Sequence, residues 1–64
     1  MTKLIRLPEV ESRCGLKRSA IYTRVKRGEF PAPIKLGGGP SIAFVSDEID
    51  VWIEAQIRAS RTPG

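Results

Sequence analysis

Cations and hydroxyl groups are concentrated in one short stretch of the chain, residues 17–27, which contains no Asp or Glu. Its polar side chains are Lys17, Arg18, Ser19, Tyr22, Thr23, Arg24, Lys26 and Arg27. Cations neutralise phosphate charge, whereas arginine and small hydroxyl residues also hydrogen-bond to the edges of nucleic-acid bases. The chemistry available in this stretch is therefore that of binding a polyanion.

No comparable set of residues supports catalysis or metal binding. The chain has one cysteine, Cys14, and no histidine, so it cannot assemble an internal disulfide, a Cys/His zinc site or a Cys–His nucleophile. We expect Cys14 to be a small buried hydrophobe. The four acids between residues 47 and 54 fit a helix start and a solvated face better than an acid–base pair. The sequence therefore predicts no enzyme activity, no catalytic residues, no cofactor, no metal and no small-molecule substrate.

Length and charge set the broad class of the protein. A chain of 64 residues holds one domain at most and leaves little room for an enzyme pocket. It has neither an apolar stretch of about 18 residues nor the apolar core of a signal peptide, so we expect no membrane partner and a cytoplasmic location. Residues 1–35 carry nine Lys and Arg against three Glu, a net +6, and residues 36–64 a net −2. A basic first half indicates either a polyanion partner or simply a solvated basic surface.

Apolar spacing, proline and glycine predict three helices. The first covers residues 8–14, with Pro8 in its first turn and Gly15 ending it. The second covers residues 18–27 and ends at Gly28. The third covers residues 47–59, begins behind Ser46 as its N-cap, and is followed by a frayed tail, residues 60–64. We accordingly expect one domain, residues 1–59, and a flexible tail.

Two short apolar runs, residues 34–36 and 42–44, flank a Gly-rich loop and predict a β-hairpin. Residues 1–6 are expected to form a short arm or strand. The glycines at 37–39 do not form a phosphate-binding loop, because a second strand follows them instead of a helix. The expected core is Val10, Cys14, Leu16, Ile21, Val25, Phe30, Phe44, Ile49, Trp52, Ile53 and Ile57.

The order of these elements (helix, glycine turn, helix, hairpin, helix) is that of a winged helix-turn-helix, a mainly α fold with a small β-hairpin. The second helix would then be the one that enters the DNA major groove. At about 100° per residue, its polar side chains lie away from the stripe formed by Ile21 and Val25. Arg18 lies nearer that stripe but begins the helix, so it can reach forward.

This placement predicts two groups of DNA contacts. Those expected at base edges in the major groove are Arg18, Ser19, Tyr22 and Thr23. Those expected at phosphates are Lys17, Lys26 and Arg27 on the second helix, and Lys35 and Ser41 on the hairpin. Arg24 is expected to flank the site.

Several motifs, in order, resemble the AlpA family of phage and prophage regulators, which are small relatives of the MerR-type winged helix-turn-helix. The matching segments are Leu7-Pro8-Glu9-Val10, Gly15-Leu16, Arg18-Ser19-Ala20-Ile21-Tyr22, Gly28-Glu29-Phe30-Pro31 with Pro33, and Ser46-Asp47-Glu48-Ile49 with Trp52. Together they span about residues 4–57. Two features depart from the family pattern: Lys17 stands where a Ser or Thr cap is usual, and the hairpin tip Gly-Gly-Gly-Pro-Ser lacks the usual polar residue.

The resemblance implies a sequence-specific DNA-binding protein of a mobile element, associated with the bacterial nucleoid. Such proteins act as transcription factors, as excisionases that bind attachment-site DNA, or as both. Further copies of the chain on repeated sites and an integrase or recombinase are the implied protein partners. The alternative hypothesis is a protein-interaction module whose basic face docks an acidic partner such as a recombinase.

Overall fold

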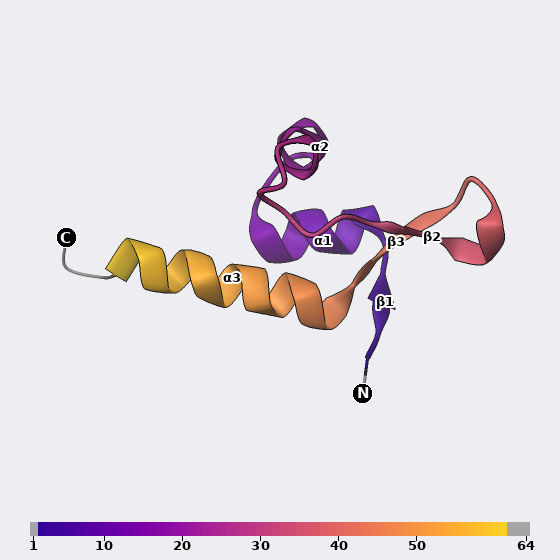
Figure 1. Ribbon diagram of the computed structural model, residues 1–64. Coiled ribbons are helices and arrows are strands. Elements are labelled where there is room, and N and C mark those ends of the chain that lie inside the picture. Colours follow the sequence, from indigo (N-terminus) through magenta and orange to yellow (C-terminus); the bar gives the residue numbers. More distant parts are fainter. Residues whose placement is uncertain (1, 62–64) are drawn as a thin grey trace.

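The computed structural model describes residues 2–61 as three helices packed around a small antiparallel sheet (Figure 1). The elements are β1 (Leu4–Ile5), α1 (Leu7–Cys14), α2 (Arg18–Lys26), β2 (Ile34–Lys35), a 3₁₀ turn η1 (Leu36–Gly38), β3 (Ile42–Val45) and α3 (Ser46–Arg61). Within residues 2–61, no helix combines the length and apolar character needed to cross a bilayer.

The turn between α1 and α2 depends on a single glycine. Gly15 lies in the left-handed region at φ 70° and donates its backbone N–H to the carbonyl of Glu11 at 2.9 Å. Glycine reaches this conformation without the Cβ clash that other residues meet, so α1 ends here as predicted. Pro8 occupies the first turn of α1, where an N–H group has no partner inside the helix.

Helix α2 begins without a side-chain cap. Lys17, the residue before it, is extended and makes no capping hydrogen bond, as its type predicts. The last helical residue is Lys26, one earlier than predicted, because Arg27 is the C-cap and Gly28 turns the chain at φ 73°. With α2 starting at Arg18 and ending at Lys26, all the expected DNA contacts between residues 17 and 27 lie on this helix or directly beside it.

The sheet has three strands in the order β1-β3-β2. The predicted hairpin is confirmed, since Ile34 pairs with Ala43 and Lys35 with Ile42. Residues 4 and 5 form a strand that pairs with the other edge of β3, so the hairpin is part of a larger sheet. Leu36, expected at the end of a strand, instead begins the 3₁₀ turn, and its N–H donates to the carbonyl of Ser41 at 2.8 Å.

Helix α3 begins one residue earlier and ends two residues later than predicted. Ser46 is its first residue rather than a cap outside it. Ser60 and Arg61 are helical, and the rest of the predicted tail, residues 62–64, lies outside the described residues. The C-terminal part of α3 extends beyond the other elements (Figure 1). Ile57 therefore meets no packing partner in the core and is 44% exposed, so its prediction as a core residue is wrong.

The core lies where β3 packs against α1 and α3, with α2 packed on α1. Its buried members are Ile5, Val10, Ile21, Phe30, Phe44 and Ile49, with Leu7, Cys14, Leu16, Val25, Trp52 and Ile53 packed against them. The Phe30 ring meets Phe44 edge-on at 6.0 Å and Trp52 at 4.7 Å between centroids. Trp52 is therefore a packing residue, as its spacing predicts. Cys14 is only half-buried, and desolvation raises the pKa of its thiol against the opposing effect of Arg13.

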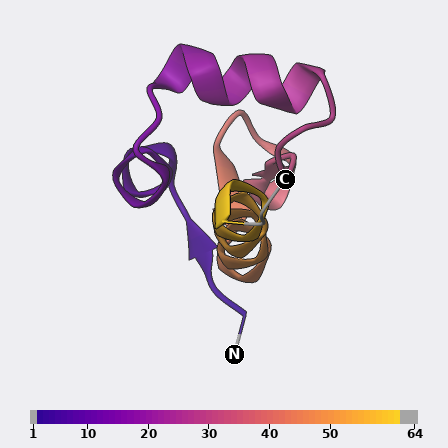
Figure 2. The same cartoon turned by 90° about the vertical axis from the view of Figure 1, so that its left-hand side faces the viewer.

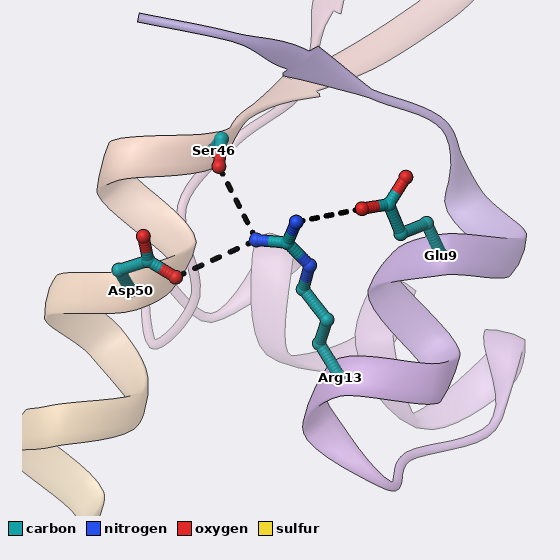
Figure 3. Close-up of polar contacts among 4 residues, drawn as sticks. All are labelled: Glu9, Arg13, Ser46 and Asp50. Atoms are coloured by element: carbon teal, nitrogen blue, oxygen red, sulfur yellow. Dashed lines mark hydrogen bonds and ion pairs between the residues drawn. The ribbon is translucent and has the colours of Figure 1, made fainter. Parts of the chain in front are cut away.

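Arg13 joins α1 to the start of α3 (Figure 3). Its Nη2 donates to Glu9 Oε2 at 2.7 Å, and its Nη1 donates to Ser46 Oγ at 3.2 Å and lies 3.5 Å from Asp50 Oδ1. Ser46, which accepts one of these bonds, is buried, with 7% of its surface exposed. One cation of the basic first half is thus engaged inside the domain.

We expect Arg13→Ala to lower the free energy of unfolding by about 1 kcal/mol, since two partly exposed ion pairs and one hydrogen bond are lost together. Arg13→Lys keeps the charge but not the fork that reaches two elements, so it recovers part of this loss. Urea denaturation measures both. Arg6→Ala, at an exposed arginine beside α1, is the control; equal losses in the two alanine variants would mean that the bridge contributes nothing.

Candidate nucleic-acid interface

Helix α2 crosses one side of the molecule, with α1, the sheet and α3 beneath it in both views (Figures 1 and 2). Its inner face is held by Ile21, which is fully buried, and by the half-buried Val25 and Ala20. Because Ile21 and Val25 are spaced one helical turn apart on this face, the helix cannot rotate without exposing Ile21. The core therefore fixes which face of α2 points outward.

Every predicted contact residue is exposed on this framework. The set is Lys17, Arg18, Ser19, Tyr22, Thr23, Lys26 and Arg27 on or beside α2, and Lys35 and Ser41 on the hairpin. Tyr22, the aromatic residue of the outer face, is 37% exposed. A long duplex can approach this face directly, because no described element covers the outer side of α2 (Figure 2).

Ser19 and Thr23 on α2 offer different hydrogen-bonding groups. Thr23 Oγ1 donates to the carbonyl of Ser19 at 2.8 Å, which commits its hydrogen to the helix. Its lone pairs and its methyl group remain available, so Thr23 presents an acceptor and an apolar contact. The side chain of Ser19 has no such bond among the described residues, so it can donate or accept.

The arginines on α2 also differ. Arg24 is half-buried, and its Nη1 donates to the carbonyl of Ala20 at 3.4 Å, so its guanidinium lies along the helix. Arg18 and Arg27 are exposed and make no such contact among residues 2–61. The bond to Ala20 and the partial burial of Arg24 separate it from the outer face, in agreement with its predicted flanking position.

The hairpin brings Lys35 and Ser41 close together but away from α2. Lys35 pairs with Ile42, the residue after Ser41, and the Leu36 N–H donates to the Ser41 carbonyl. Figure 1 shows the loop to one side of the molecule, beyond the end of the sheet. The two residues therefore form a second polar group, separate from that on α2.

Arg13 has a bridging role that was not predicted, although the spacing of Glu9 and Arg13 on one helix indicates an ion pair. The exposure of Val51 on α3 was not predicted either, and apolar periodicity offers no role for it. Neither residue belongs to the outer face of α2.

Two helices joined by a glycine turn, followed by a hairpin and a third helix, define a small winged helix-turn-helix domain. Residues 3–57 match the family described as "Prophage CP4-57 regulatory protein (AlpA)". The chain therefore belongs to the AlpA family of prophage regulatory proteins, as its motifs predict.

A relative from Enterobacteria phage P4, described as "Uncharacterized protein ORF88", is 40% identical over 55 residues. The match covers 86% of this chain and 61% of the phage protein, so the chain spans less than two thirds of that relative. No solved structure is significantly similar to the chain.

Proposed function

We propose that the protein is a sequence-specific regulator that binds double-stranded DNA with α2 in the major groove. The observation that carries the proposal is the outer face of α2, whose residues are exposed, rich in cations and hydroxyls, and free of acids. Membership of a prophage regulatory family supports it. The regulator acts in the bacterial cytoplasm, on nucleoid DNA.

The start of α2 recognises bases. N-terminal residues of a recognition helix lie nearest the groove floor, and arginine pairs with guanine through two hydrogen bonds. Arg18 takes that position, with Ser19, Tyr22 and Thr23 on the same outer face. The acceptor character of Thr23 suits an amino group of adenine or cytosine, or its methyl group suits that of thymine.

Phosphates on either side of the groove are bound by Lys17, Lys26 and Arg27. These cations lie at the two ends of α2, where a helix in the groove approaches the backbones. Lys35 and Ser41 add a contact from the hairpin. Their separation from α2 means that this contact falls on a different part of the duplex.

This mode of DNA binding is compatible with either of two roles, transcription control or excision. A helix as short as α2 contacts only a few base pairs, so further specificity comes from repeated sites, from additional copies of the chain, from an integrase or recombinase, or from DNA shape. A DNA-bending assay on sites beside an integrase gene distinguishes the two roles. A large bend at attachment sites favours excision, whereas an unbent promoter complex favours transcription control.

We expect Arg18→Ala to weaken binding to the selected site by about ten- to a hundredfold, since a bidentate base contact is worth roughly 1–3 kcal/mol. Tyr22→Ala should weaken it by less, because a phenol hydroxyl or ring offers a single contact in place of a bidentate pair. Binding to random DNA should change much less, because the phosphate cations remain. Gel shifts on both DNAs measure the difference. Arg61→Ala, at an exposed arginine on the far end of α3, is the matched control. Unchanged sequence preference in both α2 variants would contradict recognition by α2.

A further inference from the structure

A groove lies between α3 and the segment that follows α2, residues 28–32. It is open to solvent and has a volume of about 830 Å³, within the range of sites that take a ligand or several side chains. None of the residues that line it is among the nine expected DNA contacts. The groove is therefore a second surface, independent of the outer face of α2.

The floor of the groove is held in place by the core. Trp52 Nε1 donates to the carbonyl of Glu29 at 2.8 Å, which ties α3 to the 28–32 segment. The Trp52 ring also packs on Phe30, which is buried, with 5% of its surface exposed. A partner that binds here meets a preformed surface, so little ordering of the protein opposes binding.

One wall of the groove exposes an apolar side chain that has no role in the fold. Val51 is 65% exposed and points away from the core stripe of α3, which includes Ile49. Beside it in the groove lie the half-buried Trp52 and the exposed Ala55. An apolar side chain placed between Val51 and Trp52 would remove both from water, which is favourable.

The charge around the groove is opposite to that of the whole chain. Glu29, Asp47 and Glu48 line it, and no Lys or Arg does, although the chain has a net charge of +4. Asp47 accepts a hydrogen bond from Thr2 at 3.2 Å. No ion pair within residues 2–61 involves any of the three acids, so no Lys or Arg side chain of the described part of the chain is paired with them.

We propose that this groove binds a short basic segment of a partner protein, one that carries an apolar side chain between cations. The apolar side chain packs between Val51 and Trp52, and Lys or Arg side chains meet Glu29 and Glu48. Nucleic acid does not fit this surface, because its phosphates would meet three carboxylates. The groove and α2 use different residues, so the protein can hold DNA and this partner at the same time.

The probe is a synthetic peptide in which Lys and Arg alternate with Leu, compared with a peptide that carries Ser in place of Leu. Fluorescence anisotropy gives the affinity of the full chain for each, and ¹⁵N amide spectra locate the contact. We expect amide shifts centred on Val51, Trp52 and Phe30. The Ser peptide should bind at least fivefold more weakly, because it lacks the apolar contact.

Matched substitutions distinguish peptide binding in the groove from non-specific attraction of the peptide to any acidic residue. Glu48→Gln removes an acid that lines the groove, and Glu54→Gln removes one on the same helix that does not. Val51→Thr and Ile57→Thr form the corresponding apolar pair, both at exposed sites. Glu29→Gln tests a groove acid outside the helix. We expect each groove variant to weaken peptide binding about three- to tenfold. The affinity of each control variant should stay within about twofold of that of the unchanged protein.

Three results would overturn the proposal. Equal weakening by Glu48→Gln and Glu54→Gln would mean non-specific attraction of a cationic peptide. Amide shifts outside the groove would place the contact elsewhere. Concentration-dependent dimers in sedimentation that disappear with Val51→Thr would assign the groove to a second copy of the chain. Amide spectra of each free variant confirm that it is folded.

Discussion

Phe44→Ala is expected to remove a large part of the protein's stability and to lower its urea unfolding midpoint sharply. Phe44 is fully buried at the centre of the sheet and meets the ring of Phe30. Truncating a buried phenylalanine costs about 3–5 kcal/mol, from lost burial and the cavity that remains. A chain of this length has a total stability of roughly 3–10 kcal/mol, so the loss is a large part of the whole. Urea denaturation followed by Trp52 fluorescence measures it.

The matched control is Leu4→Ala, also in the sheet but 47% exposed. We expect this variant to lose less than about 1 kcal/mol, because most of its side chain is already in water. A Phe44→Ala protein with near-native stability would show that the core around β3 is more tolerant than its complete burial indicates. Comparable losses in the two variants would show that burial in the sheet does not determine stability.

DNA affinity is expected to fall by about a hundredfold when salt rises from about 50 to 200 mM, because the four proposed phosphate cations release bound counterions with a slope of about −3.6. These cations are Lys17, Lys26, Arg27 and Lys35. Removing Lys26 and Arg27 together should halve the slope, so that the same salt step costs only about tenfold. Gel shifts or anisotropy over a salt series measure the slope.

Lys3→Ala is the control for this series, because Lys3 is an exposed lysine directly before β1. Strand β1 lies on the side of the molecule away from α2 (Figure 1). Its slope should equal that of the unchanged protein. A slope that is unaffected by the Lys26 and Arg27 substitutions would place the phosphate contacts on another surface. Absence of any DNA binding, together with binding to an acidic protein, would favour the alternative in which the basic face is a protein-docking surface.

Local chemistry along the chain determined most of the elements. Gly15 and Gly28 end the first two helices because glycine alone adopts the left-handed conformation there at no steric cost. The alternation of apolar residues around the glycine-rich loop predicted the hairpin. Helical periodicity placed Ile21 and Ile49 inward, and both are fully buried. These are short-range effects, so the sequence is sufficient to predict them.

The same local logic predicted the candidate DNA-binding face, but not the roles of individual side chains. All nine residues are exposed as expected. That Thr23 uses its hydrogen within α2, or that Arg24 lies along the helix, depends on rotamers that periodicity does not specify.

Only tertiary structure decided how far each element packs against the others. Helical periodicity continues to Ile57, yet α3 extends past the core and leaves that residue exposed. Pairing of β1 with β3 and the Arg13 bridge to Ser46 join residues more than 30 positions apart, which short-range patterns do not encode. The acidic groove likewise lies where Trp52 joins α3 to the segment after α2, a contact between residues 23 positions apart. Sequence thus determined the helices and the cationic face, whereas contacts between distant residues determined which cations and apolar groups remain available to partners.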